Sequence, residues 1–167
     1  LSFRGKYQGK MGYAYTEVLD DEAVELLIKN AKANAVLIEN EDEEVIYGEQ
    51  EHYAQLDGFN PELSRVEAEE VIRLTLDMEE KAFARSDKVK AVQYCDVELV
   101  AGSCRIINSK GLDVSYRSNH LYGFLVPVVQ DGNRRNTAVA FKGTKRFEEF
   151  RSEELAREAV DDALAHL

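Results

Sequence analysis

The chain has 167 residues, a length that suits one domain or two small domains packed closely together. Its 21 Lys and Arg residues against 32 Asp and Glu residues give a formal net charge of -11, which repels a phosphate backbone and argues against direct nucleic-acid binding. The longest apolar runs, such as 121–129, fall far short of the roughly 20 residues of a membrane helix, so we expect a cytoplasmic protein without a membrane span. Because the chain opens at Leu1 with neither an initiating Met nor a signal peptide, we also expect it to belong to a longer protein.

The N-terminal part of the chain predicts a hairpin followed by a helix. Aromatic strand formers lie on both sides of Tyr7-Gln8-Gly9-Lys10, a pattern typical of a β-hairpin over residues 1–16. Acidic residues 20–22 suit a helix start, and apolar residues at three- and four-residue intervals extend this helix to about Leu37. Its expected buried stripe comprises Val24, Leu27, Ile28, Ala31, Ala35 and Ile38. The next segment, 39–60, is acidic and predicts a surface loop with at most one short strand.

The second part of the chain predicts a helix, a set of strands and a closing helix. Pro61 suits the first turn of a helix that reaches about Arg85. The apolar period then changes from about 3.6 to 2, and short turns separate the resulting strands, so neighbouring strands must be antiparallel. The predicted strands are 89–100, 104–108, 112–117, 121–130 and 137–142, with turns at Gly102, 109–111 and 131–133. With a helix from Ser152 to Leu167, the fold class is α+β: an antiparallel meander flanked by about three amphipathic helices.

The histidines predict neither a metal site nor a catalytic residue within this chain. A catalytic zinc needs about three converging ligands, often two of them histidines on one helix face, whereas His52, His120 and His166 are scattered. None lies in a nucleophile elbow or beside an obvious triad partner. The pair Asn119-His120 lies between Ser118 and Tyr122 at a predicted transition from loop to strand, where a partly exposed turn histidine is the simpler interpretation.

The two cysteines, Cys95 and Cys104, flank the predicted turn at Gly102. Reduced thiols on neighbouring strands are the favoured interpretation. The alternative is a cross-hairpin disulfide, which would require an oxidising compartment.

Several segments resemble the TldD/PmbA family, known as modulators of DNA gyrase and TldD/TldE-type metalloproteases. Residues 9–17 (GKMGYAYTE), 19–23 (LDDEA) and 30–35 (NAKANA) occur in the order of that family's first-domain signature. Residues 107–116 (INSKGLDVSY) resemble its N-S-x-G-L turn between two strands, and helix 155–167 resembles the segment before its C-terminal domain. The resemblance therefore covers nearly the whole chain and favours the PmbA/TldE-like branch.

The resemblance implies a division of the chain and a location for the chemistry. Residues 1–60 would be the end of the family's N-terminal domain. Residues 61–167 would precede a C-terminal domain, where TldD-type subunits hold zinc in a His-Glu-x-x-x-His motif. No such motif occurs in these residues. The resemblance thus carries over no catalytic or metal residue, and it implies zinc in a TldD-type partner subunit.

Two functional hypotheses follow from the resemblance. In the first, the chain works with a TldD-like partner subunit or as a homodimer on peptides or unfolded proteins. Its meander over 89–142 would help to wall a chamber, and an exposed strand edge would hold an extended peptide. Asn108, Ser109, Gly111 and Tyr116 would then either contact the peptide or simply form a structural turn. In the second, the chain is a regulatory or adaptor module without a proteolytic role.

Overall fold

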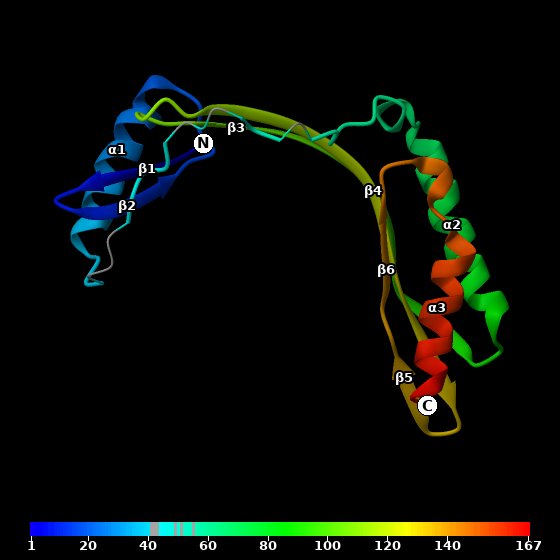
Figure 1. Ribbon diagram of the computed structural model, residues 1–167. Helices are drawn as coiled ribbons and strands as arrows, with labels where there is room; N and C mark the ends of the chain where they lie inside the picture. The colour runs from blue at the N-terminus through cyan, green and yellow to red at the C-terminus, as the bar shows by residue number, and fades with distance from the viewer. Residues whose placement is uncertain (41–43, 49, 51, 55) are drawn as a thin grey trace. The chain divides into compact units, whose positions relative to one another are not determined.

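The computed structural model of the protein describes residues 1–40, 44–48, 50, 52–54 and 56–167. The chain divides into two compact units (Figure 1). The first comprises Leu1–Glu49 and Asn108–Leu112, and the second comprises Gln50–Ile107 and Asp113–Leu167. Helices combine with antiparallel sheets throughout, which confirms the predicted α+β class. No helix in the described part of the chain is long and apolar enough to cross a membrane.

The first unit is built from the hairpin of β1 (Ser2–Tyr7) and β2 (Lys10–Tyr15) together with helix α1 (Asp21–Val36). Gln8 and Gly9 connect the two strands with φ angles of 50° and 83°, the left-handed backbone that a two-residue hairpin loop of this type requires. This confirms the predicted hairpin. The Asp20 carboxylate accepts a hydrogen bond of 2.8 Å from the Ala23 N–H and so caps α1, as its acidic start predicted.

Helix α1 packs onto the hairpin through small residues. A Cβ added at Gly12 of β2 would lie 1.8 Å from the backbone oxygen of Ala31, so the strand and the helix backbone touch directly. The buried residues of α1 are Ala23, Leu27, Ala31 and Ala35. Val24 and Ile28, which the periodicity placed in the buried stripe, are 46% and 39% exposed. A sheet of only two strands covers a narrower stripe of the helix than the apolar pattern suggests. The acidic residues 41–43 of the predicted loop lie outside the described residues.

The first helical segment of the second unit is broken, in contrast to the continuous helix predicted from Pro61. A short 3-10 turn, η1 (Leu63–Arg65), precedes helix α2 (Ala68–Arg85), and Val66 and Glu67 between them are extended. The Glu70 carboxylate accepts a hydrogen bond of 3.1 Å from the Glu67 N–H, which starts α2 afresh at this point. The apolar pattern before Ala68 has a helical period, but this side-chain cap makes α2 begin at Ala68.

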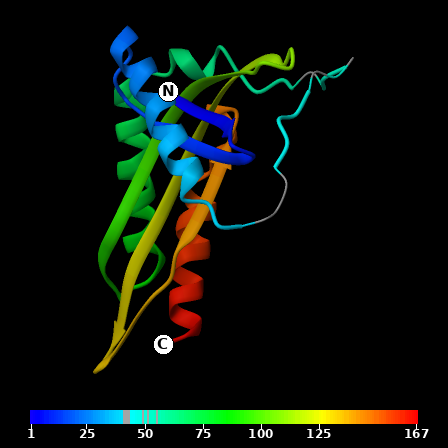
Figure 2. The ribbon, with the colours of Figure 1, turned by 90° about the vertical axis from the view of Figure 1, so that its left-hand side faces the viewer.

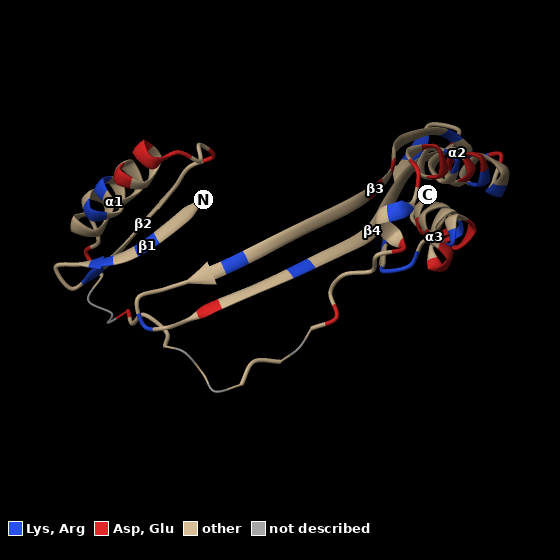
Figure 3. Cartoon of the chain, turned by 90° about the horizontal axis from the view of Figure 1, so that it is seen from above, with Lys and Arg blue, Asp and Glu red and all other residues tan. Residues whose placement is uncertain are grey.

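The sheet of the second unit is dominated by two strands of 19 residues each, β3 (Val89–Ile107) and β4 (Asp113–Asp131). On its other side, β4 pairs with β5 (Arg134–Thr137) and with β6 (Ala140–Thr144). All of these pairings are antiparallel, as the short turns predicted. Figure 3 shows that β3 and β4 carry few charged residues, whereas α2 and α3 (Ser152–Ala165) carry many of both signs.

Two predicted breaks within these strands are wrong. Gly102 does not turn the chain but pairs with Ser118 inside a continuous ladder, and His120 lies within β4 rather than at the end of a loop. Positive φ angles occur instead at Gly111 and Gly132, the turns that join β3 to β4 and β4 to β5. A glycine within a strand-forming sequence therefore does not by itself predict a turn. Neighbouring residues must also favour one.

Helices α2 and α3 lie side by side and pack on the same face of this sheet (Figures 1 and 2). The core between them includes the fully buried side chains of Met78, Leu121, Leu125 and Leu155. An ion pair of 2.7 Å between Arg85 and Asp161 joins the two helices. Among the described residues of this unit, no helix packs against the opposite face of the sheet.

Candidate functional site

The predicted turn residues lie at the tip of the hairpin that joins β3 to β4. The side chain of Asn108 shapes this turn, because its Oδ1 accepts hydrogen bonds from the N–H groups of Lys110 at 2.9 Å and Leu112 at 3.3 Å. Its Nδ2 donates to the Tyr47 carbonyl at 2.7 Å. Gly111 supplies the left-handed backbone with a φ of 87°, and Ser109 is exposed. Contact of these residues with a peptide stays a prediction.

Tyr116 does not lie in that turn. It is a residue of β4, opposite Cys104 of β3, and is 54% exposed. Side chains alternate across a strand, so Tyr116 shares its face of the sheet with His120, Tyr122 and Phe124. The structure thus separates Tyr116 from Asn108 and places it on the uncovered face of the second unit.

The free edge of the sheet can be located from the direction in which the backbone N–H and C=O groups of β4 and β6 form hydrogen bonds. The Asn119 N–H donates to the Gly58 carbonyl at 3.1 Å, so it points away from β3. Hydrogen-bonded and non-bonded pairs alternate along an antiparallel ladder, so Leu121 and Gly123 also direct their backbone groups away from β3, toward β6. In β6 the bonded partners are then residues 140, 142 and 144. The N–H and C=O groups of Phe141 and Gly143 point to the outer edge, where β6 has no strand partner in the described part of the chain.

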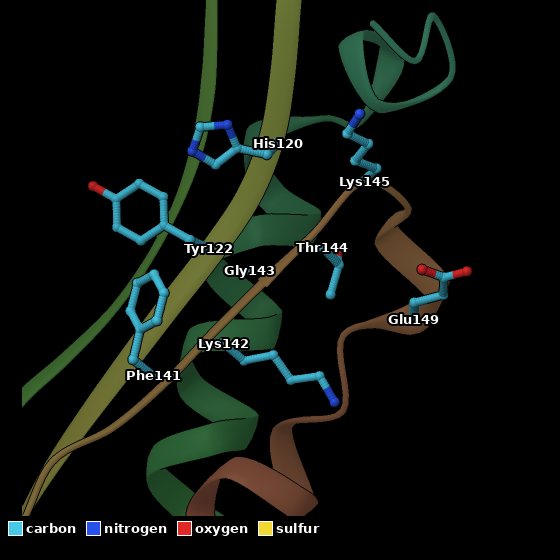
Figure 4. Close-up of a pocket in the computed structure, with 8 residues that line it drawn as sticks. All are labelled: His120, Tyr122, Phe141, Lys142, Gly143, Thr144, Lys145 and Glu149. Carbon is cyan, nitrogen blue, oxygen red and sulfur yellow. The ribbon is translucent and has the colours of Figure 1, made fainter. Parts of the chain in front are cut away.

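A pocket of about 740 Å³ opens at this β6 edge. Figure 4 shows its lining: the rings of His120, Tyr122 and Phe141 lie on one side of β6, and the side chains of Lys142, Thr144 and Glu149 lie on the other. Between them is Gly143, where an added Cβ would meet no atom closer than 4.0 Å. The pocket therefore gives an incoming backbone open access to the edge of β6.

The uncovered side of the sheet carries a patch that we call the aromatic face, made of Tyr94, His120, Tyr122, Phe124 and Phe141. Ring centroids are 5.8 Å apart for His120 and Tyr122, 5.8 Å for Tyr122 and Phe141, and 6.4 Å for Tyr94 and Phe124. Tyr94 and Phe141 are 57% and 64% exposed. Such a cluster of exposed rings is typical of a surface that binds another chain.

Two carboxylates, Asp96 and Glu98, lie on the same face of β3 as Tyr94. The Tyr122 hydroxyl donates a hydrogen bond of 2.5 Å to Glu98 Oε2. Desolvation, together with the hydrogen bond and charge of Glu98, raises the pKa of Asp96 above its usual range. Among the described residues, neither carboxylate forms an ion pair with Lys or Arg. This face therefore concentrates negative charge beside aromatic rings.

The cations at the pocket already have partners. Lys142 pairs with Glu154 at 3.3 Å, and Lys145 donates to the Asp57 carbonyl at 2.8 Å. In Figure 4, Lys142 lies on the opposite side of β6 from the rings, and Lys145 follows the end of the strand. Aromatic rings thus line one side of the pocket, whereas Lys142 and Glu149 lie on the other.

The cysteines do not lie on neighbouring strands as predicted, because the chain does not turn at Gly102. Cys95 and Cys104 are both on β3, nine residue steps apart, which in a strand separates their Cα atoms by about 30 Å and rules out a disulfide between them. The Cys95 thiol donates to the Thr75 carbonyl at 3.4 Å, and burial raises the pKa of Cys95 to about 11. In the described part of the chain, no three His, Cys, Asp or Glu side chains cluster as a metal ion would require.

Sequence reasoning missed the aromatic face and the β6 edge. The signal for the first was present, since residues 120, 122 and 124 alternate with the apolar core positions 121 and 125. The helix-covered face of the sheet could not be assigned before the packing of α2 and α3 was known.

These features define an α+β protein whose main unit is a long-stranded antiparallel sheet, with two helices on one face and an open edge strand. The sequence pattern of the PmbA/TldA metallopeptidase central domain matches residues 61–167, and the chain belongs to this family. No curated protein matches the chain.

Solved structures share this fold. A candidate modulator of DNA gyrase from Thermotoga maritima MSB8 is 19% identical, with a TM-score of 0.72 over 98% of this chain and 36% of that protein. TldE from Thermococcus kodakarensis is 20% identical, with a TM-score of 0.72 over 96% and 36%. A candidate modulator of DNA gyrase from Bacteroides thetaiotaomicron VPI-5482 is 14% identical, with a TM-score of 0.79 over 99% and 39%. The chain thus spans between 36% and 39% of the length of these proteins.

Proposed function

We propose that this chain is the non-catalytic N-terminal and middle portion of a PmbA/TldD-type metallopeptidase, where it helps to form the chamber that holds peptide substrates. Membership of the family and the likeness to TldE support this assignment. The observation that carries it is the free β6 edge, with the outward backbone groups of Phe141 and Gly143 beside a pocket of about 740 Å³.

An extended peptide would bind this edge as an additional strand. Its main chain would exchange hydrogen bonds with the N–H and C=O groups of Phe141 and Gly143, as strand-addition complexes do. Most of the affinity would then come from backbone groups that every peptide has, so many sequences would be accepted. The missing side chain at Gly143 leaves room for the close approach of the incoming strand.

The catalytic chemistry is assigned to sequence outside this chain. The described residues offer no set of three zinc ligands, so no hydrolytic step is attributed to them. In the proposal, residues 1–60 end the N-terminal domain, and residues 61–167 precede a C-terminal domain of the PmbA/TldE-like type. A TldD-like partner subunit supplies zinc, with a homodimer as the other possible assembly, and the complex acts on peptides or unfolded proteins in the cytoplasm.

A proline substitution at the β6 edge tests this proposal. Gly143→Pro removes an outward N–H but none of the groups that bond β6 to β4, so the sheet should tolerate it as edge strands do. In the complex of the intact protein with its zinc-bearing partner, we expect kcat/KM for an unstructured peptide to fall roughly fivefold or more, because at least one main-chain hydrogen bond is lost.

The matched control is Ser103→Pro, which removes an outward N–H at the outer edge of β3, where the described part of the chain provides no strand partner. We expect this variant to keep normal turnover. Unchanged turnover by a folded Gly143→Pro variant would contradict the proposal, and it is the result that an adaptor without a proteolytic role predicts. Loss of turnover in the Ser103→Pro variant alone would indicate that the peptide binds the edge of β3 rather than that of β6.

A further inference from the structure

We propose that the aromatic face, with the Asp96 and Glu98 carboxylates, selects peptides that carry an arginine side chain over Phe141 and Tyr122. The inference rests on the proposed function, since it specifies which peptides the β6 edge prefers. Arginine is the complement of this surface in shape and in charge.

The geometry requires a long side chain. Neighbouring strands are about 4.8 Å apart, so a peptide strand paired with β6 lies roughly 10 Å from β4. Alternate peptide side chains point to the aromatic face, where they first meet Phe141 and then Tyr122, whose centroids are 5.8 Å apart. The Tyr122 hydroxyl already contacts Glu98 at 2.5 Å. A side chain that lies across both rings therefore ends close to this carboxylate.

The negative charges of Asp96 and Glu98 favour a cation at the end of this peptide side chain. Asp96 and Glu98 have no Lys or Arg partner in the described part of the chain, and the pKa of Asp96 is raised by desolvation and by its neighbour Glu98. A guanidinium would neutralise the negative charge of Asp96 and Glu98 and would stack on the rings of Phe141 and Tyr122 at the same time. Lysine fits less well, because its ammonium neither stacks flat nor binds a carboxylate through two parallel hydrogen bonds.

Acidic and apolar side chains fit this position less well. An acidic side chain would be repelled by Asp96 and Glu98. An apolar one would shield the two carboxylates from water without pairing them, which is unfavourable. The lysines of the pocket do not alter this. Lys142 lies on the other side of β6 and pairs with Glu154, and Lys145 follows the end of β6 and donates to the Asp57 carbonyl.

The test compares three eight-residue peptides of Gly, Ala and Ser, with blocked ends and a single central Arg, citrulline or Glu. Citrulline keeps the size and planar end group of arginine, but it is neutral and carries a carbonyl oxygen in place of one guanidinium nitrogen. Fluorescence anisotropy with the intact protein should show that the Arg peptide binds about tenfold more tightly than the citrulline peptide, the size expected for a cation over aromatic rings beside a carboxylate. The difference should shrink as salt is added.

The double variant Asp96→Asn with Glu98→Gln should remove this preference and leave the affinity for the citrulline peptide unchanged. Its control, Glu158→Gln with Asp162→Asn, makes the same change of charge on exposed residues of α3 and should keep the preference. Equal binding of Arg and citrulline peptides, or a preference that survives in the Asp96 and Glu98 variant, would overturn the inference.

The same measurements separate this inference from the proposed function. If the citrulline peptide binds and Gly143→Pro abolishes its binding, the edge holds peptides whether or not arginine is preferred. If no peptide binds the protein, both the inference and the peptide-holding role fail. Tighter binding of the Glu peptide would reverse the assigned charge and also overturn the inference.

Discussion

The side chain of Asn119 pairs with the backbone of Asn60 through two hydrogen bonds of 2.7 Å each. Asn119 Oδ1 accepts from the Asn60 N–H, and Asn119 Nδ2 donates to the Asn60 carbonyl. The same Nδ2 donates to Ser64 Oγ at 3.0 Å, and Asn119 is only 3% exposed. A single side chain of β4 thus holds the segment before η1 against the sheet as a neighbouring strand would.

Replacing Asn119 should destabilise the second unit. Asn119→Ala removes three hydrogen bonds and leaves half-buried backbone groups of Asn60 without this partner, so we expect a loss of about 2–4 kcal/mol in the free energy of unfolding. Urea denaturation measures it. Asn136→Ala, which removes one half-buried hydrogen bond to the Ala163 carbonyl, is the control and should cost about 1 kcal/mol. Equal losses in the two variants would contradict the role of Asn119.

The contact between Asp77 of α2 and Ser152 of α3 should make stability depend on pH. The Ser152 hydroxyl and Lys81 Nζ both donate to Asp77 Oδ2, and the hydrogen bond from Lys81, followed by that from Ser152, lowers the pKa of Asp77. A carboxylate with a lowered pKa in the folded state contributes stability above its unfolded pKa of about 3.9. That stability is lost as the pH falls through the folded value.

We therefore expect Asp77→Asn to be less stable than the wild type at pH 7, with a difference that shrinks below about pH 4. Urea denaturation from pH 7 to pH 2.5 follows this difference. The other carboxylates are the same in both proteins, so their titration cancels. A difference that stays constant over the whole range would show that Asp77 contributes through packing rather than through its charge.

Gly12 should tolerate no side chain. A Cβ at this position would lie 1.8 Å from the Ala31 oxygen and 2.9 Å from the Ala35 nitrogen, so Gly12→Ala must push α1 away from β2. Overpacking of this kind costs about 1–3 kcal/mol or more. Gly102→Ala is the matched control, since an added Cβ there meets nothing within 4 Å. Thermal unfolding should show a lower midpoint for Gly12→Ala and an unchanged or slightly higher one for Gly102→Ala.

The thiol of Cys95 should resist alkylation at neutral pH. Burial raises the pKa of Cys95 to about 11, so only about one molecule in a thousand carries the reactive thiolate at pH 8. With iodoacetamide, mass spectrometry should show labelling of Cys95 that accelerates steeply from pH 8 to pH 10 and becomes fast in urea at pH 8. Rapid labelling of the folded protein at pH 8 would contradict this environment.

Local backbone chemistry determined which parts of the fold could be predicted. The hairpin at Gln8-Gly9 and the turn at Gly132 were predictable, because glycine beside a polar residue at a strand boundary favours positive φ. The antiparallel arrangement followed from the short turns. Gly102 misled the prediction because the same residue type also occurs within strands. The break before Ala68 was missed because it depends on the Glu70 side chain rather than on the apolar period.

The candidate site depends on contacts between distant segments and was less accessible from sequence. The alternation around Tyr122 was readable, but its exposure depends on where α2 and α3 pack. Likewise, the outward direction of the Gly143 backbone follows from the bond between Asn119 and Gly58, which are 61 residues apart. Asn108 was singled out by a motif, and the structure adds its hydrogen bonds within the turn.

The tight turn between β3 and β4 also has an effect far from its own residues. Side chains alternate with a period of two, so a slip of one residue between these strands would exchange every inward position for an outward one. Leu121 and Leu125 would leave the core, and the rings of His120 and Tyr122 would be forced beneath the helices. The pairing of β3 with β4 stays regular from Ile107–Asp113 at this turn to Tyr94–Val126. By fixing the register at one end of this stretch, a few small and polar residues determine which side chains the sheet exposes at its other end.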